Sequence, residues 1–465
     1  MALATPTEIL ASLWRQTGLS PAAMPAVTLT GAEPALPSSF RVGAAAQATI
    51  AASGAAAAAI WQRRSGRAQQ VSVEMRHAAV EFHSEHYLKL TGQQAADPWD
   101  SIAGTYVCGD GRVVRLHTNF PHHRAGILKL LGCEGTRPAV AAALGKWQGF
   151  AFEDAAAAAG MCVTAMRSFA EWDAHPQGQA VARLPVLELV RIGDAPPTPL
   201  PGAGTRPLEG LRVLELTRVI AGPVCGRTLA AHGADVLHIS AAHLPAFDHL
   251  NVDVNRGKRS AQLDLRDVAG QAQLRALAGQ ADVFVQGYRP GAVASHGFTP
   301  EALAALRPGI ICTSLSAYGG VGPWGDRRGF DSLVQTASGF NHAEALAAGV
   351  APPKVLPCQA LDHASGFLLA FGTMAALLRR AEEGGSWLVK VSLAGTGWWL
   401  RNLGRLENGF AADVPSFEDV QPLTERTQTG FGELTALRDA AVLSATPSHW
   451  ALGSVPLGTH AAAWS

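Results

Sequence analysis

The sequence predicts an α/β fold with a mostly parallel sheet and a smaller α+β domain. Two observations support this prediction. Hydrophobic, strand-like segments alternate with helical segments across residues 211–339, which is typical of βαβ units. A Pro-rich segment at residues 195–202 divides the chain, and the part before it mixes helical patterns with a hairpin pattern. We therefore expect a first unit at residues 1–195, a linker at residues 196–206 and a second unit at residues 207–465.

The first unit is expected to combine helices with short strands. Hydrophobic periodicity predicts a helix over residues 44–64, a strand over 71–73 and a second helix from about 76 to 90. Residues 106–117 carry a Gly-Asp-Gly turn between apolar runs, which favours a hairpin. Helices are predicted to fill the stretch from about residue 123 to 174.

In the second unit, strands are predicted at residues 211–216, 234–239 and 281–285, each followed by a turn or a helical segment. A basic stretch at residues 255–260 directly precedes a fourth strand-like run at 261–265.

Composition limits the classes of function. The chain has 465 residues, which is enough for roughly two to four domains. Hydrophobic residues make up 48% and charged residues 16%, so a large core is expected. Lys plus Arg and Asp plus Glu both number 37, and this balance argues against nucleic acid or an anionic membrane as the main partner.

The cysteines and the N-terminus indicate a cytoplasmic protein. The six cysteines form no CxxC pair, so we expect reduced, mostly buried thiols. Residues 1–6 lack the basic and apolar segments of a signal peptide. The Ala-rich stretch at residues 44–60 is closest to a membrane span, but Gln47, Thr49 and Ser53 suit a tightly packed soluble helix better.

An internal repeat links the two units. Residues 55–75 contain a small-residue helix, a pair of arginines and a strand, and residues 370–393 follow the same plan. Counted back from the paired arginines, Asp362 of the second copy falls opposite Ala46 of the first. The repeat indicates one functional copy and one structural copy, although a chance match between an Ala-rich helix and a strand would look alike.

The basic stretch from Asn255 through Arg256, Lys258 and Arg259 to Ser260 is a candidate anion site. Arginine presents a planar fork to phosphate oxygens, and lysine presents a mobile point charge. A solvated turn is the simpler interpretation. The surrounding βαβ pattern favours a phosphate-bearing ligand.

The second unit lacks the sequence motifs that bind dinucleotides or nucleoside triphosphates. Its first strand leads into a turn with Gly222 and Pro223 at a helix start, where backbone amides favour phosphate. Neither a three-glycine dinucleotide fingerprint nor a GxxxxGK[ST] loop is present. NAD and ATP are therefore not expected.

Asp362 is the candidate catalytic residue. It stands at the start of an apolar, small-residue helix. An Asp at this position is commonly an N-cap, but a carboxylate held against a buried helix is also how a nucleophilic carboxylate is partly desolvated. The Gly-rich loop at residues 318–323 is either a source of oxyanion-binding amides or a plain loop.

These residues carry a family resemblance. The chain resembles the class III coenzyme A transferases, the CaiB/BaiF family, which includes formyl-CoA transferase and α-methylacyl-CoA racemase. The order and spacing of the motifs agree across residues 210–393. The matching segments are residues 210–223, 233–236, 255–260, 281–283, 289–291, 314–319, 322–323 and 328–331, with Gln335, Ser338 and Gly339.

The resemblance implies a Rossmann-like CoA-binding domain, and residues 1–195 resemble the later part of a family unit. The chain is thus expected to be built from two partial family units in an unusual order. Asp362 matches the catalytic aspartate of the family. The resemblance implies that it forms an acyl-aspartyl anhydride and then an aspartyl-CoA thioester, so that coenzyme A passes to a carboxylic acid acceptor.

The resemblance also implies ligand contacts and an assembly. Acyl-CoA is expected as a substrate, with no tightly bound cofactor and no metal, and family members form interlaced homodimers. The rearranged order would either keep a homodimer or replace it by intramolecular pairing of the two units. Expected coenzyme A contacts lie on three loops and in the basic stretch: Arg218, Val219, Ala221, Asn255, Arg256, Lys258, Arg259, Tyr288, Arg289 and Arg328.

Two departures from the family pattern leave alternatives open. Ser240 stands where the family often has Glu, and Phe330 stands where racemase members carry a His. Racemisation needs a proton relay on each face of Cα, so the loss of this His argues against a racemase, unless His363 or His342 supplies an unusual relay. A non-catalytic CoA-binding protein is the other alternative, because duplicated units often lose activity.

His77, His83 and His86 fall on one predicted helix with two glutamates. Spaced histidines of this kind can bind zinc, but no HExxH or Cys cluster accompanies them. We expect a solvated or interface face here.

Overall fold

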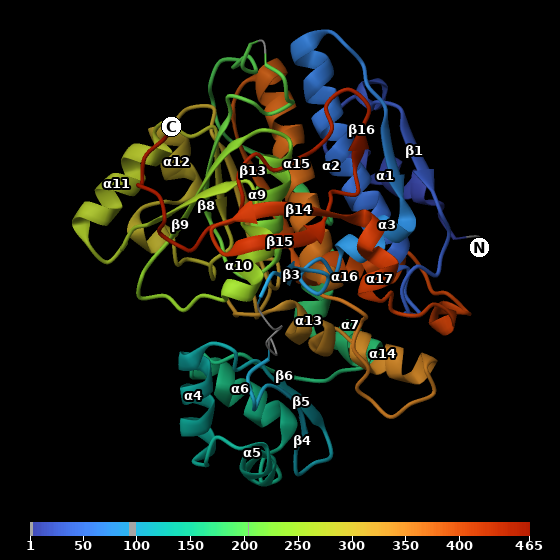
Figure 1. Cartoon of the computed structure of the whole chain (residues 1–465). Coiled ribbons are helices and arrows are strands. Elements are labelled where there is room, and N and C mark those ends of the chain that lie inside the picture. The colour runs from blue at the N-terminus through green and yellow to red at the C-terminus, as the bar shows by residue number, and fades with distance from the viewer. Residues whose placement is uncertain (1–2, 93–98, 203) are drawn as a thin grey trace.

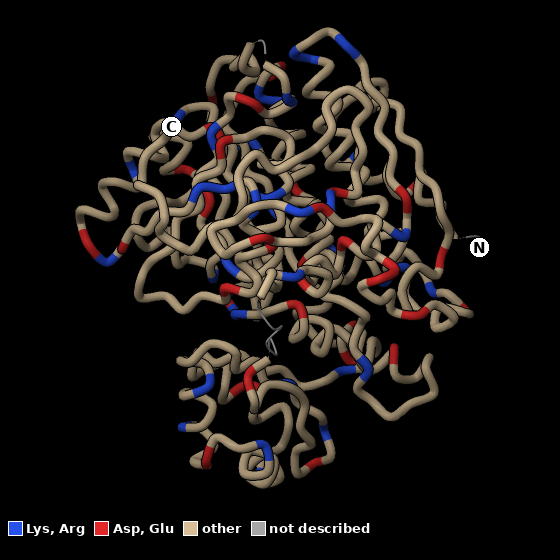
Figure 2. Tube along the Cα trace, viewed as in Figure 1, with Lys and Arg blue, Asp and Glu red and all other residues tan. Residues whose placement is uncertain are grey.

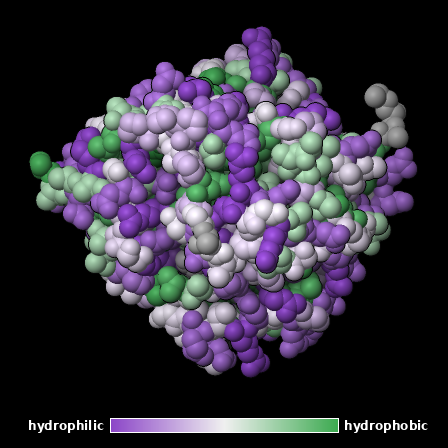
Figure 3. Space-filling view, turned by 90° about the horizontal axis from the view of Figure 1, so that it is seen from above, coloured by the Kyte–Doolittle hydropathy of each residue, from purple (hydrophilic) through white to green (hydrophobic). Residues whose placement is uncertain are grey.

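The computed structural model describes residues 3–92, 99–202 and 204–465 (Figure 1). Met1 and Ala2 of the N-terminal segment and Ala203 of the predicted linker lie outside the described residues. A large α/β body contains both termini, and a smaller lobe projects from one end of it. Figure 2 shows charges of both signs interspersed along the chain. On the face seen in Figure 3, hydrophobic residues occur in small separate patches.

A seven-stranded sheet with the order β10-β9-β8-β11-β12-β13-β7 forms the centre of the large body. All neighbouring strands are parallel except β13 and β7. The order reverses between β8 and β11, which creates a topological switch point. The strands are β7 (Glu188–Gly193), β8 (Arg212–Leu216), β9 (Asp235–Ser240), β10 (Lys258–Gln262), β11 (Val283–Gln286), β12 (Ile311–Ser316) and β13 (Ser386–Ser392).

Helices cover both faces of this sheet. One face packs against α9 (Ala221–Ala231) and α15 (Ala360–Glu383). The other packs against α11 (Val268–Ala278) and α12 (Pro300–Leu306). Helix α15 touches α9 so closely that a Cβ on Gly366 would lie 2.6 Å from the Ala221 carbonyl oxygen. The sequence prediction of a Rossmann-like α/β fold is confirmed.

A further helix, α2 (Val42–Ser65), lies against α15 on the side away from the sheet (Figure 1). Both helices are long and apolar enough to cross a membrane, and the apolar 18-residue stretch of each is completely buried inside the protein. Burial of a helix on all sides explains why its sequence is apolar all round. The two helices thus form the core between the two predicted units.

Three small sheets complete the fold. Strands β1 (Val27–Thr30), β2 (Val71–Glu74) and β16 (Val442–Leu443) form one of them, and β14 (Thr424–Thr429), β15 (Gly432–Leu437) and β3 (Lys89–Leu90) form another. The third, in the smaller lobe, is antiparallel and contains β4 (Gly104–Val107), β5 (Val113–Leu116) and β6 (Val163–Ala165). Strands β4 and β5 confirm the hairpin predicted at residues 106–117.

The remaining helices surround these sheets. The lobe contains α4 (Pro121–Leu131), α5 (Arg137–Leu144) and α6 (Gly149–Ala158). The other α-helices are α1 (Pro6–Gln16), α3 (Met75–Glu81), α7 (Phe169–Ala174), α8 (Pro176–Val181), α10 (Asp248–Val254), α13 (Asp331–Ala337), α14 (Phe340–Ala347), α16 (Leu393–Asn402) and α17 (Phe417–Val420). Short 3₁₀ turns are η1 (Pro21–Ala23), η2 (Ala294–His296), η3 (Gly409–Ala411) and η4 (Gln421–Leu423).

The two predicted units exchange strands. Strand β7 precedes the Pro-rich segment but pairs with β13 of the second unit. Conversely, β16 of the second unit pairs with β2, and β15 pairs with β3. Neighbours in space are therefore drawn from both sides of the Pro-rich segment.

Three local predictions were wrong. Strand β6 interrupts the stretch of residues 123–174 that helices were expected to fill, because it pairs with β5 of the hairpin. The helix expected from about residue 76 to 90 ends at Glu81, and turns follow, because Glu81 and Ser84 reach into a buried polar network with the second unit. The basic stretch does not precede its strand but begins it, since β10 starts at Lys258. There the Lys258 ammonium is neutralised by a buried carboxylate, so a charged residue occupies an interior strand position.

Candidate functional site

A cavity of about 450 Å³ lies at the carboxyl ends of the central strands, at the switch point. Its walls include residues that directly follow β8, β9, β10 and β11. This is where ligands bind in open α/β sheets. Residues from the smaller lobe close the opposite side: Phe120, His122, His123 and Cys162.

The structure brings most of the predicted site residues to this cavity. Those that line it are Asp362, Arg218, Val219, Ala221, Tyr288, Arg289 and Arg328. Asn255 lines a small adjoining cavity of about 20 Å³, which shares Arg218 and Val219 with the large one. Both polar atoms of the buried Asn255 amide lack a hydrogen-bond partner within the described residues.

The three cations of the basic stretch line neither cavity. Lys258 Nζ lies 2.8 Å from Glu215 Oε2, and both side chains are completely buried. Arg256 Nη2 and Arg259 Nη2 each lie 2.8 Å from the carboxylates of Asp253 and Asp235, respectively. The clustered charge that suggested a phosphate site is thus compensated inside the protein.

The loop after β8 is strained where it meets the cavity. Val219 has φ = +74° and is the non-glycine residue with a positive φ in the described part of the chain. A β-branched side chain rarely adopts this conformation, and such strain is commonly retained at functional sites. Next to it, the Arg218 guanidinium lies 4.8 Å from the ring centre of Phe120 and 5.2 Å from that of Tyr288.

Asp362 lies in the first turn of α15, but it is not the N-cap of this helix. The N-cap is Gln359, whose side chain makes no capping bond. Instead, the Asp331 carboxylate of α13 accepts the backbone N–H groups of Leu361 and Asp362 at 2.7 and 2.9 Å. Among the described residues, none donates a hydrogen bond to the Asp362 carboxylate, which is left facing the cavity.

The environment of Asp362 disfavours its charged form. Burial, the charge of Asp331 and the charge of Glu85 together raise the pKa of Asp362 well above its usual range. Only 7% of the residue is exposed. A desolvated carboxylate of raised basicity is a stronger nucleophile than one in water. This arrangement suits attack on a carbonyl carbon held in the cavity.

The lobe residues at the cavity were not predicted. His123 Nε2 lies 3.4 Å from Arg328 Nη1 and 3.7 Å from Cys162 Sγ. Burial lowers the pKa of His123 to about 3 and raises that of Cys162 to about 12, so both groups are neutral near pH 7. The Phe-Pro-His-His run after the hairpin was the available signal, but its position at the site depends on docking of the lobe.

The histidines considered for a racemase relay lie away from the cavity. Neither His363 nor His342 is among the described residues that line it. Phe330 lines it and stacks on His117, with ring centres 3.7 Å apart. His83 and His86 stack on each other at 4.5 Å beyond the end of α3, so they do not lie on one helix with His77 as expected.

The Gly-rich loop at residues 318–323 also lies apart from Asp362. Gly319 and Gly320 line a second cavity of about 240 Å³, and neither is among the described residues that line the first. The Gln177 side chain of α8 donates hydrogen bonds to the carbonyls of Tyr318 and Val321, each at 2.9 Å. The loop is thus held by the first unit.

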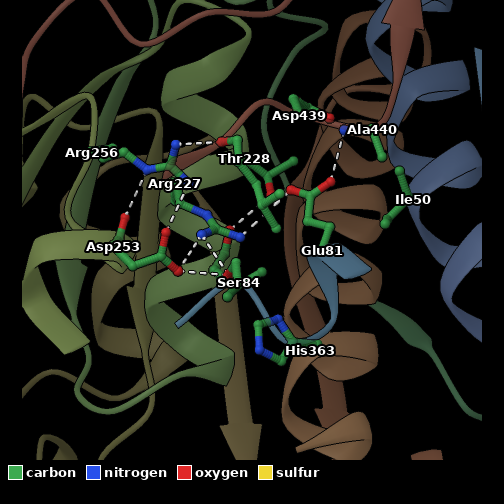
Figure 4. A network of polar contacts seen from close by, with 12 residues as sticks. Ile50, Glu81, Ser84, Arg227, Thr228, Asp253, Arg256, His363, Asp439 and Ala440 are labelled. Carbon is green, nitrogen blue, oxygen red and sulfur yellow. Dashed lines mark hydrogen bonds and ion pairs between the residues drawn. The ribbon is translucent and has the colours of Figure 1, made fainter. Parts of the chain in front are cut away.

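A buried polar network joins the two units behind the site (Figure 4). Arg227 Nη1 of α9 donates to Asp253 Oδ2 at 2.6 Å and to Ser84 Oγ at 3.1 Å, and Arg227 Nη2 lies 3.6 Å from Glu81 Oε1. Burial acts to raise the pKa of Asp253, but Arg227 and Arg256 lower it to about 2. The first unit thus contacts the buried charges of Arg227 and Asp253 through the Ser84 hydroxyl and the Glu81 carboxyl group.

Comparisons with known proteins find relatives over large parts of the chain. The model of CoA-transferase family III matches residues 18–197 and 208–421. The chain is similar to probable fatty acyl-CoA transferase Rv3272 of Mycobacterium tuberculosis, with 34% identity covering 53% of this chain and 67% of that protein. It is 33% identical to mouse succinyl-CoA:glutarate CoA-transferase over 38% of this chain and 43% of that protein.

Two further comparisons are partial. Acetyl-coenzyme A transferase nodX of Hypoxylon pulicicidum is 33% identical over 54% of this chain and 44% of its own length. A crystal structure of Rv3272 is similar over 42% of this chain and 56% of that chain, with 35% identity and a TM-score of 0.40. The chain therefore spans less than half of the length of two of these relatives.

Proposed function

Because this chain belongs to CoA-transferase family III, we propose that it moves coenzyme A from an acyl-CoA donor to a carboxylic acid through covalent intermediates on Asp362. One observation carries the proposal. The Asp362 carboxylate is relieved of helix capping by Asp331, is nearly buried, and opens onto the cavity at the switch point. A carboxylate in this position has no evident structural task.

The proposed chemistry uses one nucleophile for both half-reactions. An Asp362 carboxylate oxygen attacks the thioester carbonyl carbon, the C–S bond breaks, and the electron pair leaves with the coenzyme A thiolate. The thiolate then attacks the aspartyl carbonyl of the mixed anhydride, which releases the donor acid as its carboxylate. The acceptor carboxylate repeats this sequence in reverse on the aspartyl-CoA thioester. Protons and electrons balance without a metal or a redox partner.

We propose that coenzyme A is held along the cavity wall by the loops after β8 and β11. Arg218, Arg289 and Arg328 line this wall and supply positive charge, which suits the phosphates of coenzyme A. Asn255 would contribute from the adjoining cavity. The side chains of Arg256, Lys258 and Arg259 pair with carboxylates of the protein instead of lining a cavity. Of the proposed coenzyme A contacts, these three have the least structural support.

The proposal is tested by trapping the intermediate. Incubation with acyl-CoA and then hydroxylamine is expected to convert Asp362 into its hydroxamate, seen as a mass shift of the Asp362 peptide. The matched Asp331→Asn protein keeps a carboxylate at 362 and controls for labelling of the wrong residue. An unmodified Asp362 peptide across a broad panel of acyl-CoA donors would refute the transferase and favour a non-catalytic CoA-binding protein.

An α-methylacyl-CoA racemase or isomerase is the second candidate. His122 and His123 line the same cavity, and burial lowers the pKa of both. The neutral imidazole of His122 can accept a proton, whereas His123, with a pKa of about 3, is a weak base. The two activities differ in solvent exchange. A transferase leaves the Cα hydrogen of a 2-methylacyl-CoA in place, whereas rapid entry of solvent deuterium would identify a racemase.

We further propose that the protein is cytoplasmic and that intramolecular pairing of the two partial family units takes the place of the expected homodimer. The exchange of strands between the two units within one chain supports intramolecular pairing of the partial family units. Sedimentation of the purified protein distinguishes a dimer from a monomer that is complete by itself.

A further inference from the structure

Directly after Asp362, His363 forms a buried pair with a residue of the first unit. His363 Nε2 lies 2.9 Å from Glu85 Oε2. The His363 side chain is completely buried, and that of Glu85 is 15% exposed. The His363 ring also stacks on Phe82, with ring centres 5.7 Å apart. The first unit thus contacts α15 at the residue next to the proposed nucleophile.

The pair lies within a group of titratable side chains drawn from both units. The charge of Glu85 acts to raise the pKa of Asp362. The charge of His363 acts to lower the pKa values of Asp331 and Asp253. Burial acts to raise the pKa of Glu85, but the charge and hydrogen bond of His363 hold it below its usual range. Glu85 is therefore an ionised carboxylate. The other titratable groups that face the pair are His83, His249 and Cys358.

The other copy of the repeat shows what a purely structural residue does at this position. Counted as before, Gln47 falls opposite His363. Its amide donates to the carbonyls of Thr30 and Val73 at 2.7 and 2.9 Å, which closes the space with uncharged groups. At His363 the same position instead holds a contact between an imidazole and a carboxylate, with 2.9 Å between His363 Nε2 and Glu85 Oε2. A neutral hydrogen bond would have sufficed for packing alone.

We propose that Glu85 and His363 are positioning residues that set the orientation and charge environment of Asp362, so that the nucleophile has its full reactivity only when the first unit is docked. The inference rests on the proposed role of Asp362 as a nucleophile. The negative charge of Glu85 disfavours the charged form of Asp362 and makes that carboxylate more basic. His363 keeps Glu85 charged and keeps it in place.

The test is the pH dependence of Glu85→Gln. The wild-type rate falls at low pH as Asp362 becomes protonated. Removal of the Glu85 charge lowers the pKa of Asp362, so the acid limb of kcat/KM is expected to move to lower pH by roughly one unit. On the plateau, kcat falls roughly threefold if carboxylates follow the Brønsted slope of thiolates, and KM for acyl-CoA is unchanged.

Two further variants keep the test decisive. Glu85→Asp retains the charge and is expected to restore the wild-type acid limb. If Glu85→Gln does not fold, His363→Gln gives the same shift, because Glu85 without the hydrogen bond and charge interaction of His363 keeps its proton to higher pH. The control is Glu344→Gln, which removes a buried carboxylate that bridges the units through Ser38 and Ser39. It is expected to lower Tm without moving the acid limb.

Carbon-13 NMR of protein with labelled aspartate follows the titration of Asp362 in the absence of substrate. The Asp362 signal is assigned as the one that is missing in Asp362→Asn. Failure of this proposal is therefore separate from failure of the transferase. If the Asp362 titration and the acid limb stay in place in folded Glu85→Gln and His363→Gln proteins, the pair is only structural and the proposal is overturned.

Discussion

Helices α2 and α15 are similar in length and packing but differ in the residue near their N-terminal ends. Each has 24 residues, is buried by the other, and ends at a glycine with a φ of +70°. In α2 the position equivalent to Asp362 is Ala46, which is completely buried. In α15 the carboxylate faces a cavity. The difference shows that a duplicated helix keeps its packing role while only one copy keeps an open site.

The largest expected effect concerns the nucleophile itself. Asp362→Asn is expected to lower the transfer rate by at least about a thousandfold, since no other carboxylate would form the anhydride. Its stability is expected to rise at neutral pH. Folding raises the pKa of Asp362, so ionisation of the carboxylate destabilises the folded wild type as pH increases, and Asn lacks this cost. Transfer assays and thermal melts check both effects, and an unchanged rate would contradict the proposed role.

The second prediction tests whether the first copy can be converted. Ala46→Asp places a carboxylate in a fully buried position without a partner. We expect a loss of roughly 3 kcal/mol or more in the free energy of unfolding, measured by urea denaturation, with Ala46→Ser as the milder control. If Ala46→Asp restored activity to an Asp362→Asn protein, the two copies would not differ as described.

The third prediction separates the cations that line the cavity from those that do not. Arg218→Ala is expected to raise KM for acyl-CoA about tenfold with little change in Tm, since one charge-assisted contact is lost. Lys258→Met leaves Glu215 buried without its partner, so it is expected to cost about 3–5 kcal/mol of stability. If Lys258→Met folds normally but has a raised KM for acyl-CoA, the basic stretch does bind coenzyme A and this prediction is wrong.

Local patterns were sufficient for most of the fold. Apolar runs predicted β8, β9 and β11 because these strands lie in the core, where buried positions are occupied by apolar side chains. They failed for β10, because Lys258 is buried only through Glu215, 43 positions earlier in the chain. They failed again at α3, which ends where Ser84 turns toward Asp253 of the second unit.

The residues of the candidate site likewise fall into a group that the sequence predicted and a group that it did not. Asp362 and the loops after β8 and β11 belong to one continuous family-like segment, so their order along the chain predicted their meeting at the cavity. Phe120 and His123 reach the cavity from the first unit, and Glu85 of the same unit contacts His363 of α15. Their place depends on how two units dock, and a single sequence carries no local sign of it.

The smallest effect is expected at the network that joins the units. Burial and the charge of Asp439 raise the pKa of Glu81 to about 8. In the unfolded chain the group ionises near its usual value, so the folded protein binds one more proton between these pH values and loses stability as pH rises toward 8. Glu81→Gln removes this dependence. Its Tm is expected to match that of the wild type near pH 4, where Glu81 is protonated in both the folded and the unfolded chain, and to exceed it increasingly as pH rises to 8, because Arg227 keeps Asp253 and Ser84 as partners. A Glu81→Gln protein that is less stable at every pH would show that Glu81 is charged when folded, and that the two units are joined by a full ion pair rather than by a protonated carboxyl group.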